Sequence, residues 1–201
     1  MLFRSPDIEL IPELKKKKPG TLVIGCVAGL RPVKDLPMLV RAAAGLNTRF
    51  KLVIVGEGPE RQTILDAAEA MAIEDQVILP GFLPEPHRYM GLFDIFAMSS
   101  KSEQAPISVI EAMAAGLPVV STRVGDIPVM VSPENVPFLA PRHHEVDLRD
   151  RIDTLARNPE SMHYIGEQNR ARARALFDEA AMIASYARLY GAAMGRPDAL
   201  Q

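Results

Sequence analysis

The sequence contains no tryptophan and a single cysteine, and only 5% of its 201 residues are aromatic. So few rings argue against a nucleic-acid surface built on base stacking. The lone Cys26 lies inside the apolar run TLVIGCVAG, where a buried, reduced thiol is expected rather than a disulfide or a nucleophile. We therefore expect no nucleic-acid partner and a cytoplasmic location.

An excess of charge of one sign is also lacking, because the formal net charge is −2 at pH 7. The local exception is KKKK at residues 15–18, which we interpret as a solvated linker, since a polybasic anchor usually needs a lipid or an apolar helix face as well. No basic-then-apolar leader opens the chain, and no apolar run approaches the ~18 residues of a membrane-spanning helix. These features predict a soluble protein.

Short apolar runs alternate with stretches of helical periodicity along much of the chain. The expected strands are residues 21–28, 51–55, 76–81, 94–99 and 117–122, and the expected helices are residues 36–45, 56–72, PHRYMGLF (86–93) and PISVIEAMAAG (106–116). Strands and helices that alternate at this pace need crossover connections, which give a parallel sheet with helices on both faces. The predicted fold class is α/β, an open doubly wound sheet of the Rossmann-like kind.

The two ends of the chain differ from this repeating part. Residues 1–20 lack sustained periodicity and end in a Pro-Gly breaker, so we interpret them as a lead-in segment before a domain of residues 21–201. From Glu145 onward the pattern is all-helical, in about three segments, and forms a tail to the sheet. The acids of DLRDRIDTLARN (147–158) share one helical face, which we expect to be solvated.

Ligands of such sheets bind beyond the carboxyl ends of the strands, so the loops after the strands are the candidate site. These loops carry glycines that let backbone approach a ligand, and two cations, Arg31 and Lys34, that suit phosphate. Each cation taken alone is more often a solvated loop residue. The coincidence of five such loops favours an anion site, to which the helix starts would add unpaired N–H groups.

Two acids stand eight positions apart in SEQAPISVIE, and an unpaired buried charge there would be costly. Glu103 precedes the expected helix, where an interaction with the helix macrodipole is a simpler explanation for it. Glu111 lies in the second turn, between apolar neighbours that offer it no structural partner. Because a carboxylate can accept from two vicinal hydroxyls, the pair around a helix start suits a nucleotide-linked sugar.

These residues resemble a known family. EQAPISVIE followed by AMAAGLPVVSTRVGD resembles the E-x7-E signature and the downstream block of retaining glycosyltransferases with the GT-B fold. GLRPVKDLPMLVRAAAGL, KLVIVGEGPERQTI and QVILPGFLPEPHRYMGLFDIFAMSS resemble the family's earlier blocks, in its order, and RALFDEAAMIASYARLY resembles its closing helices. The similarity covers residues 21–190 and implies one half of a GT-B fold, the half that binds the donor.

The resemblance also implies roles for single residues. Glu103 would accept hydrogen bonds from the donor sugar and Glu111 from the ribose, and a UDP-, GDP- or ADP-sugar would be the substrate, with no further cofactor. Arg31 and Lys34 would neutralise the diphosphate, assisted by backbone N–H groups near Pro106, Ile107 and Ser108. The base would rest against Gly81, Phe82 and Leu83, and the further donor-binding residues are Gly29, Gly56 and Gly58. The resemblance implies that the catalytic residues are Glu103, Arg31 and Lys34.

Some positions depart from the family. An arginine is common where this chain has Gly29, so Arg31 would take over its phosphate contact, and Asp126 and Val129 alter a Gly-Gly-x-x-Glu block. No D-x-D occurs, and the adjacent His143 and His144 are expected at the surface, so we predict no metal.

A GT-B enzyme has two domains, of which the N-terminal one binds the acceptor. We interpret this chain as the second, donor-binding domain alone, either excised or naturally truncated. The chain alone is then expected to bind nucleotide but to transfer sugar poorly. A peripheral association with membranes is a further option for the full enzyme. The alternatives are a non-catalytic nucleotide-sugar binding or regulatory module, and a signalling receiver domain, which GLRPVK argues against because its cations replace the expected acids.

Overall fold

The computed structural model describes residues 6–195, so the first five residues of the expected lead-in and the last six of the tail lie outside the described part. One sheet of six parallel strands has the order β3-β2-β1-β4-β5-β6. The strands are β1 (Leu22–Val27), β2 (Phe50–Val55), β3 (Val77–Gly81), β4 (Ile95–Met98), β5 (Val119–Thr122) and β6 (Leu139–Ala140). The winding reverses between β1 and β4, which makes the sheet doubly wound and Rossmann-like, as predicted.

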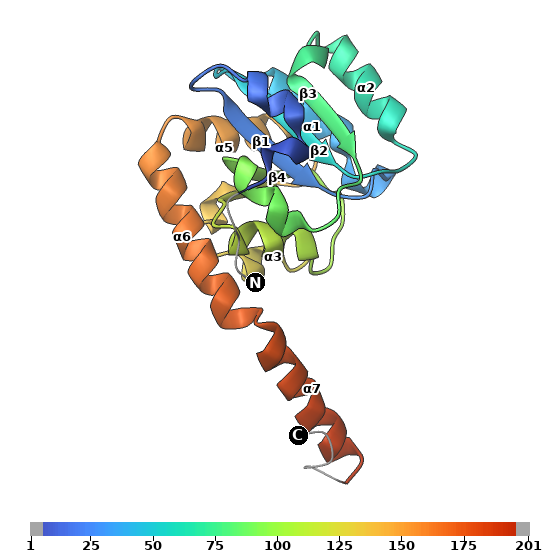
Figure 1. Cartoon of the computed structure of the whole chain (residues 1–201), viewed down its shortest axis with the longest axis vertical. Helices are drawn as coiled ribbons and strands as arrows, with labels where there is room; N and C mark the ends of the chain where they lie inside the picture. Colours follow the sequence, from blue (N-terminus) through green and yellow to red (C-terminus); the bar gives the residue numbers. More distant parts are fainter. Residues whose placement is uncertain (1–5, 196–201) are drawn as a thin grey trace.

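Both faces of the sheet are covered, because the strands are mostly apolar and have to be shielded from water on each side (Figure 1). The helices are α1 (Leu36–Ala44), α2 (Arg61–Ala70), α3 (Ile107–Ala114), α4 (Ile127–Met130), α5 (Glu145–Ala156), α6 (Pro159–Leu176) and α7 (Glu179–Ala193). Helices α1, α2 and α5 pack on one face with alternate residues of β1 and β2. Helix α3 and several 3-10 turns cover the other face.

Two expectations about secondary structure were wrong. The sequence analysis found five strands and missed β6, because a strand of two residues leaves no periodic signal. The segment PHRYMGLF is not one short helix but two 3-10 turns, η5 (Pro86–Arg88) and η6 (Met90–Leu92). Between the turns Tyr89 has a φ of −129°, which is outside the helical range and separates them.

Buried polar residues attach the last helices to the rest of the domain. Asp153 on α5 is buried and accepts hydrogen bonds from the backbone N–H and the side chain of Asn47, so the expected solvation of all the acids in 147–158 was wrong at this residue. Asn135 bonds to both backbone groups of Val119, and Asn169 on α6 donates to Asn135 Oδ1 at 2.7 Å. Burial is tolerated because these groups have partners.

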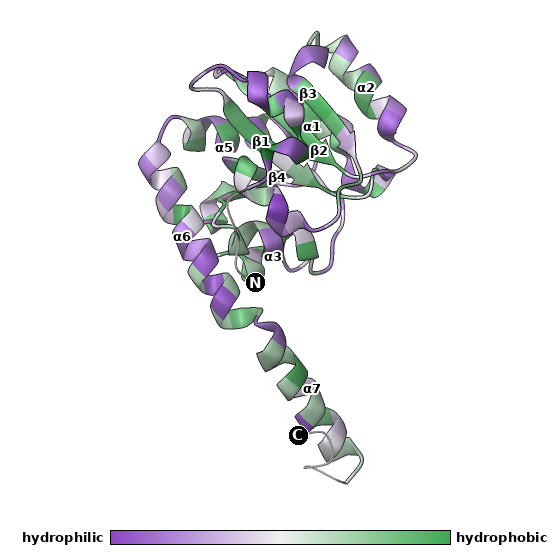
Figure 2. Cartoon of the chain, viewed as in Figure 1, coloured by the Kyte–Doolittle hydropathy of each residue, from purple (hydrophilic) through white to green (hydrophobic). Residues whose placement is uncertain are grey.

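The two ends of the described chain behave differently. The lead-in forms the 3-10 turns η1 (Ile8–Leu10) and η2 (Pro12–Lys16), and its residues Ile11 and Leu14 are buried against the sheet. Helix α7 instead extends away from the sheet and carries exposed apolar side chains along its length (Figure 1, Figure 2). No helix of the described part is long and apolar enough to cross a membrane.

Candidate functional site

The centre of the site lies where β1 and β4 end side by side, at the reversal of the winding. Lys34, in the 3-10 turn η3 (Pro32–Lys34) after β1, donates from Nζ to Oε1 of Glu103 at 2.6 Å. The side chains of Lys34 and Glu103 are 20% and 9% exposed. The structure thus joins two predicted residues, 69 positions apart in the sequence, into one shielded ion pair.

Hydroxyl groups at the end of β4 hold this ion pair in place. Ser100 Oγ donates to the same Oε1 of Glu103 at 2.6 Å, and the single hydroxyl proton of Ser99 is shared between the carbonyl oxygens of Lys34 and Asp35, at 2.9 and 2.8 Å. Thr122 Oγ1, at the end of β5, donates to the carbonyl of Ser100 at 2.6 Å. The sequence analysis missed these three hydroxyls, although their places at or just after the ends of buried strands could have revealed them.

The loop after β2 is packed tightly against the loop after β1. Gly56 and Gly58 have φ values of 146° and 157°, and a Cβ at either residue would overlap a backbone carbonyl, that of Ala28 or Leu30. Leu30 N–H donates to Glu57 O at 2.9 Å and fixes the two loops together. These glycines therefore allow the two loops to pack closely against each other at the strand ends. Gly29, in the loop after β1, is exposed.

The start of α3 faces the same end of the sheet. Its N-cap residue is Pro106, which makes no side-chain cap, and Ile107 is 70% exposed. Since proline has no N–H, the donors available here are those of Ile107 and Ser108. The loop before the helix rests on Gly125, whose φ is 54° and whose Cβ position lies against the carbonyl oxygens of Glu103 and Gln104.

Glu111 occupies different surroundings. It lines a cavity of about 510 Å³ together with Ile107, Ile110 and Ala114 of α3 and Ala173, Arg174, Phe177, Asp178, Glu179 and Ala180 from the α6–α7 corner. The carboxylate forms no hydrogen bond or ion pair with any residue of 6–195. Burial of this half-buried group raises its pKa above the usual value, and Glu103 is not among the lining residues.

The loop after β3 is held in place by a buried tyrosine. Gly81 ends the strand and is buried, Phe82 is 71% exposed, and Leu83 is half-buried. The buried Tyr89 donates its hydroxyl to the carbonyl of Leu83 at 3.3 Å. The pKa of Tyr89 is raised by burial and, to a smaller extent, by the charge of Glu111. No pattern in the sequence had marked Tyr89.

The remaining polar candidates are simple to place. Arg31 is exposed at the N-cap of η3. Burial raises the pKa of Cys26 to about 12, with smaller opposing effects of Lys34, which lowers it, and Glu103, which raises it. The described residues hold no group of three His, Cys, Asp or Glu side chains placed to bind a metal. His143 and His144 are exposed, as expected.

Comparison of the sequence with protein families gives one match that covers most of the chain. Residues 7–172 match the family described as glycosyl transferases group 1. The chain is 28% identical over 166 residues to N-acetyl-alpha-D-glucosaminyl L-malate synthase of Bacillus anthracis, covering 82% of this chain and 44% of that enzyme. It spans less than half the length of the curated relatives it matches.

Solved structures with a similar fold point the same way. The Anabaena protein HepE, in complex with UDP, superposes with a TM-score of 0.83 at 22% identity, over 92% of this chain and 52% of that one. The C-terminal domain of the glycosyl transferase group 1 protein LpcC of Francisella tularensis has a TM-score of 0.74 at 19% identity, over 88% of this chain and 96% of that domain. The sheet, its winding and the family match agree, and the chain belongs to the group 1 glycosyltransferases, as a C-terminal domain of the GT-B fold.

Proposed function

We propose that this chain is the donor-binding half of a retaining glycosyltransferase, which moves a hexosyl group from a UDP-, GDP- or ADP-sugar to a sugar, lipid or other acceptor. The observation that carries the proposal is the Lys34–Glu103 pair at the reversal of the winding, beside the uncapped start of α3. Parallel sheets of this order bind ligands at that point. The pair brings a cation and a carboxylate to within reach of a phosphate and a neighbouring sugar.

The diphosphate would bind between the loop after β1 and the start of α3. Arg31 is exposed and can turn towards it, and the N–H groups of Ile107 and Ser108 point out of an uncapped helix end. Gly29, Gly56 and Gly58 leave room for the phosphates to approach the backbone. Lys34 would stabilise the negative charge while it remains bonded to Glu103.

Sugar and ribose would then lie on opposite sides of the phosphates. Glu103 uses one carboxylate oxygen for Lys34 and Ser100, so its other oxygen can accept from hydroxyls of the donor sugar. Glu111 would accept from the ribose hydroxyls, and Phe82 offers an exposed ring against which the base can rest, next to Gly81 and Leu83. A ligand hydroxyl would give Glu111 the partner that residues 6–195 do not.

The chemical task of this half is to stabilise the departing diphosphate. Negative charge grows on the leaving group as the sugar becomes oxocarbenium-like, and fixed donors in a partly shielded site lower the energy of that charge. The cations Lys34 and Arg31 and the α3 N–H groups are such donors. These groups act electrostatically, by attracting the charge of the leaving diphosphate, and we assign no protein nucleophile.

We further propose that an acceptor-binding domain completes the enzyme, within a longer chain or as a partner. The chain covers less than half of its relatives, and α7 exposes Met182, Ile183, Tyr186, Leu189 and Tyr190 on a helix with little contact to the sheet. Without that domain the acceptor is not positioned, so transfer by this chain alone should be weak. A cytoplasmic enzyme with a peripheral membrane association is consistent with this proposal.

The proposed function predicts that UDP or GDP raises the melting temperature, because a ligand that binds only the folded state stabilises it by about 2.7 kcal/mol at a hundred times its Kd. The measurement is thermal unfolding with and without nucleotide. Lys34→Ala and Glu111→Ala should each reduce the ligand-induced shift, whatever they do to the unliganded protein. Lys15→Ala is the control, because Lys15 pairs with Glu9 at the surface. Absence of binding by every nucleoside diphosphate and nucleotide sugar at millimolar concentration would refute the proposal.

A further inference from the structure

A second cavity with strong charge lies at the other end of the sheet, where β1, β2 and β3 begin. This basal pocket has a volume of about 290 Å³ and is lined by Lys16, Lys17, Lys18, Thr21, Arg49, Phe50, Lys51, Asp75 and Gln76. Parallel strands place their carboxyl ends at one edge of the sheet, so the pocket is separate from the Lys34–Glu103 site.

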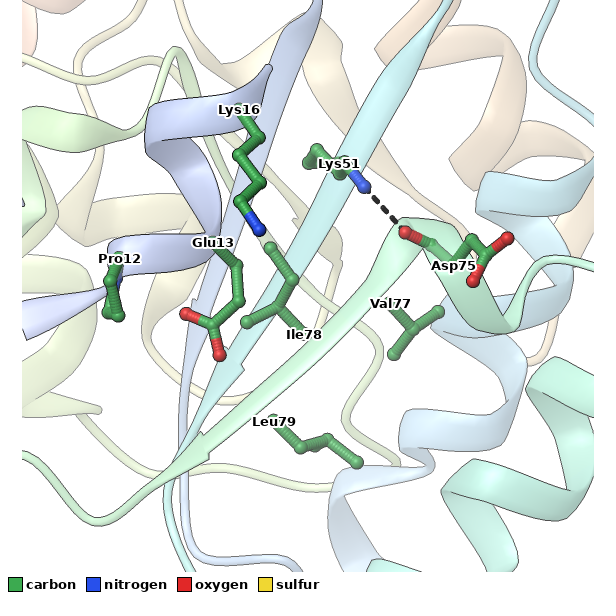
Figure 3. A pocket seen from close by; sticks show the side chains of 8 residues that line it. All are labelled: Pro12, Glu13, Lys16, Lys51, Asp75, Val77, Ile78 and Leu79. Atoms are coloured by element: carbon green, nitrogen blue, oxygen red, sulfur yellow. Dashed lines mark hydrogen bonds between the residues drawn. The ribbon is translucent and has the colours of Figure 1, made fainter.

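Five of the lining residues are cations and one is an acid. None of the five cations has an ion-pair partner among residues 6–195, whereas the neighbouring Lys15, which does not line the pocket, is paired with Glu9. Asp75 offsets little of this charge. Lys51 Nζ donates to the backbone carbonyl of Asp75 at 2.5 Å, whereas the carboxylate of Asp75 points away from Lys51 (Figure 3).

An unsatisfied buried hydroxyl belongs to the same pocket. Thr21 is 5% exposed, and its Oγ1 has no hydrogen-bond partner in the described structure. A buried hydroxyl without a partner is costly, typically by about 1–3 kcal/mol, unless a ligand or water satisfies it. The side-chain amide of Gln76 also lacks a partner, because its Oε1 is buried and makes no hydrogen bond. Rotating this amide by a half-turn would direct its NH2 donors into the pocket.

The shape of this region leaves room for a group larger than a single ion. A cavity of about 530 Å³ adjoins the basal pocket and shares Lys16, Lys51 and Asp75 with it (Figure 3). Glu13 contributes the one other acid of this adjoining cavity, and its remaining wall is apolar: Pro12, Val77, Ile78 and Leu79. The cations therefore gather on the basal side.

We propose that the basal pocket binds a phosphate-bearing anion, through Lys17, Lys18 and Arg49 at its rim and the hydroxyl of Thr21 inside. Charge-assisted hydrogen bonds from several cations recognise phosphate, and the Thr21 hydroxyl supplies a neutral donor. The phosphate belongs either to a small soluble compound or to an anionic lipid headgroup. Neither use depends on the donor site, so the proposal stands or falls separately from the proposed function.

The test titrates pyrophosphate into the protein labelled with nitrogen-15, at low salt, and follows amide shifts. Thr21, Lys51 and Gln76 should shift together, and the affinity should fall as salt is added, because exposed charges are screened. The double variant Lys18→Gln/Arg49→Gln should bind about tenfold more weakly or worse. Thr21→Val keeps every charge and nearly the same shape, and should weaken binding about threefold.

The matched control is Lys15→Gln, which removes a charge from the same run of lysines but not from the pocket, and should change the affinity less than about twofold. A parallel arm measures co-sedimentation with phosphatidylglycerol vesicles against phosphatidylcholine vesicles. Pyrophosphate binding lost in the double variant supports a soluble ligand, and vesicle binding alone, lost in the same variant, supports a lipid. If neither probe binds, or if the double variant binds as Lys15→Gln does, the proposal is wrong.

Discussion

The surroundings of Glu103 and Glu111 differ more than their eight-residue spacing suggests. Glu103 is 9% exposed and bonded to Lys34 and Ser100, within a frame of hydroxyl and backbone hydrogen bonds between β4 and β5. Glu111 is half-buried beside a cavity, and no described residue bonds to its carboxylate. On one side of the α3 start, the carboxylate of Glu103 has its hydrogen-bond partners within the fold. On the other side, the carboxylate of Glu111 would have to accept hydrogen bonds from a ligand or water.

This difference separates two contributions to a binding site. The fold itself benefits from Glu103, because removing it would leave a shielded ammonium without its partner. The fold gains nothing from the charge of Glu111, since burial without a partner opposes ionisation. Mutations on the two sides should therefore change stability in opposite directions, although both weaken nucleotide-sugar binding.

The largest expected effect breaks the Glu103 side through its backbone. In Gly125→Ala the new Cβ would overlap the carbonyl oxygens of Glu103 and Gln104, and alanine disfavours a φ of 54°. We expect a loss of about 2–4 kcal/mol in the free energy of unfolding, measured with urea. Gly20→Ala is the control: its φ is 73° and its Cβ would meet nothing within 4 Å, so it should lose only about 1 kcal/mol. Equal losses of stability in the two variants would show that the loop of Glu103 and Gln104 can move away from the new Cβ without cost.

A smaller effect is expected when only the charge of Glu103 is removed. Glu103→Gln keeps the shape but leaves Lys34 without its counter-charge, which should cost about 1–2 kcal/mol. The control is Glu145→Gln, because Glu145 pairs with Arg41 at 2.7 Å but the two side chains are 38% and 41% exposed. That pair should be worth less than about 1 kcal/mol. Similar values for the two variants, measured with urea at neutral pH, would remove the distinction between a shielded and an exposed pair.

The smallest effect should have the opposite sign. The pKa of Glu111 is raised in the folded protein, so the folded state holds this proton more tightly than the unfolded one, and stability falls as the pH rises above the usual pKa of 4.5 towards the raised value. Glu111→Gln cannot ionise and should be slightly more stable than the parent at pH 7 and equal to it at pH 4. Because water reaches the group, the gain should stay below about 1 kcal/mol. Urea unfolding at both pH values checks this, and a loss of stability at pH 7 would reveal a partner for the carboxylate.

Much of the fold was predictable, because alternating apolar runs and helical segments leave few arrangements other than a doubly wound parallel sheet. The elements that escaped prediction are set by tertiary contacts. Strand β6 has only two residues, and η5 and η6 are separated at Tyr89, which the core buries completely. Asp153 looked like one of several surface acids until its bonds to Asn47, 106 positions away, were seen.

For the site, the sequence could indicate which residues follow strands but not which of them touch. Lys34 and Glu103 were both candidates, and their bond exists because β1 and β4 are neighbours in the sheet, a fact about strand order rather than local pattern. Glu111 was placed correctly in the second turn of α3, yet the cavity beside it depends on the α6–α7 corner, more than 60 residues later. The assigned roles of these residues in donor binding stay predictions.

The shielding of Cys26 makes the chain convenient to label. Its thiol is the only one, is 1% exposed, and has a pKa of about 12, so maleimide dyes should leave the folded protein untouched. A cysteine introduced at the exposed Phe82 would then carry a fluorophore at a single known place, with no need to remove the native thiol. The domain can therefore be labelled for fluorescence experiments with its native cysteine in place.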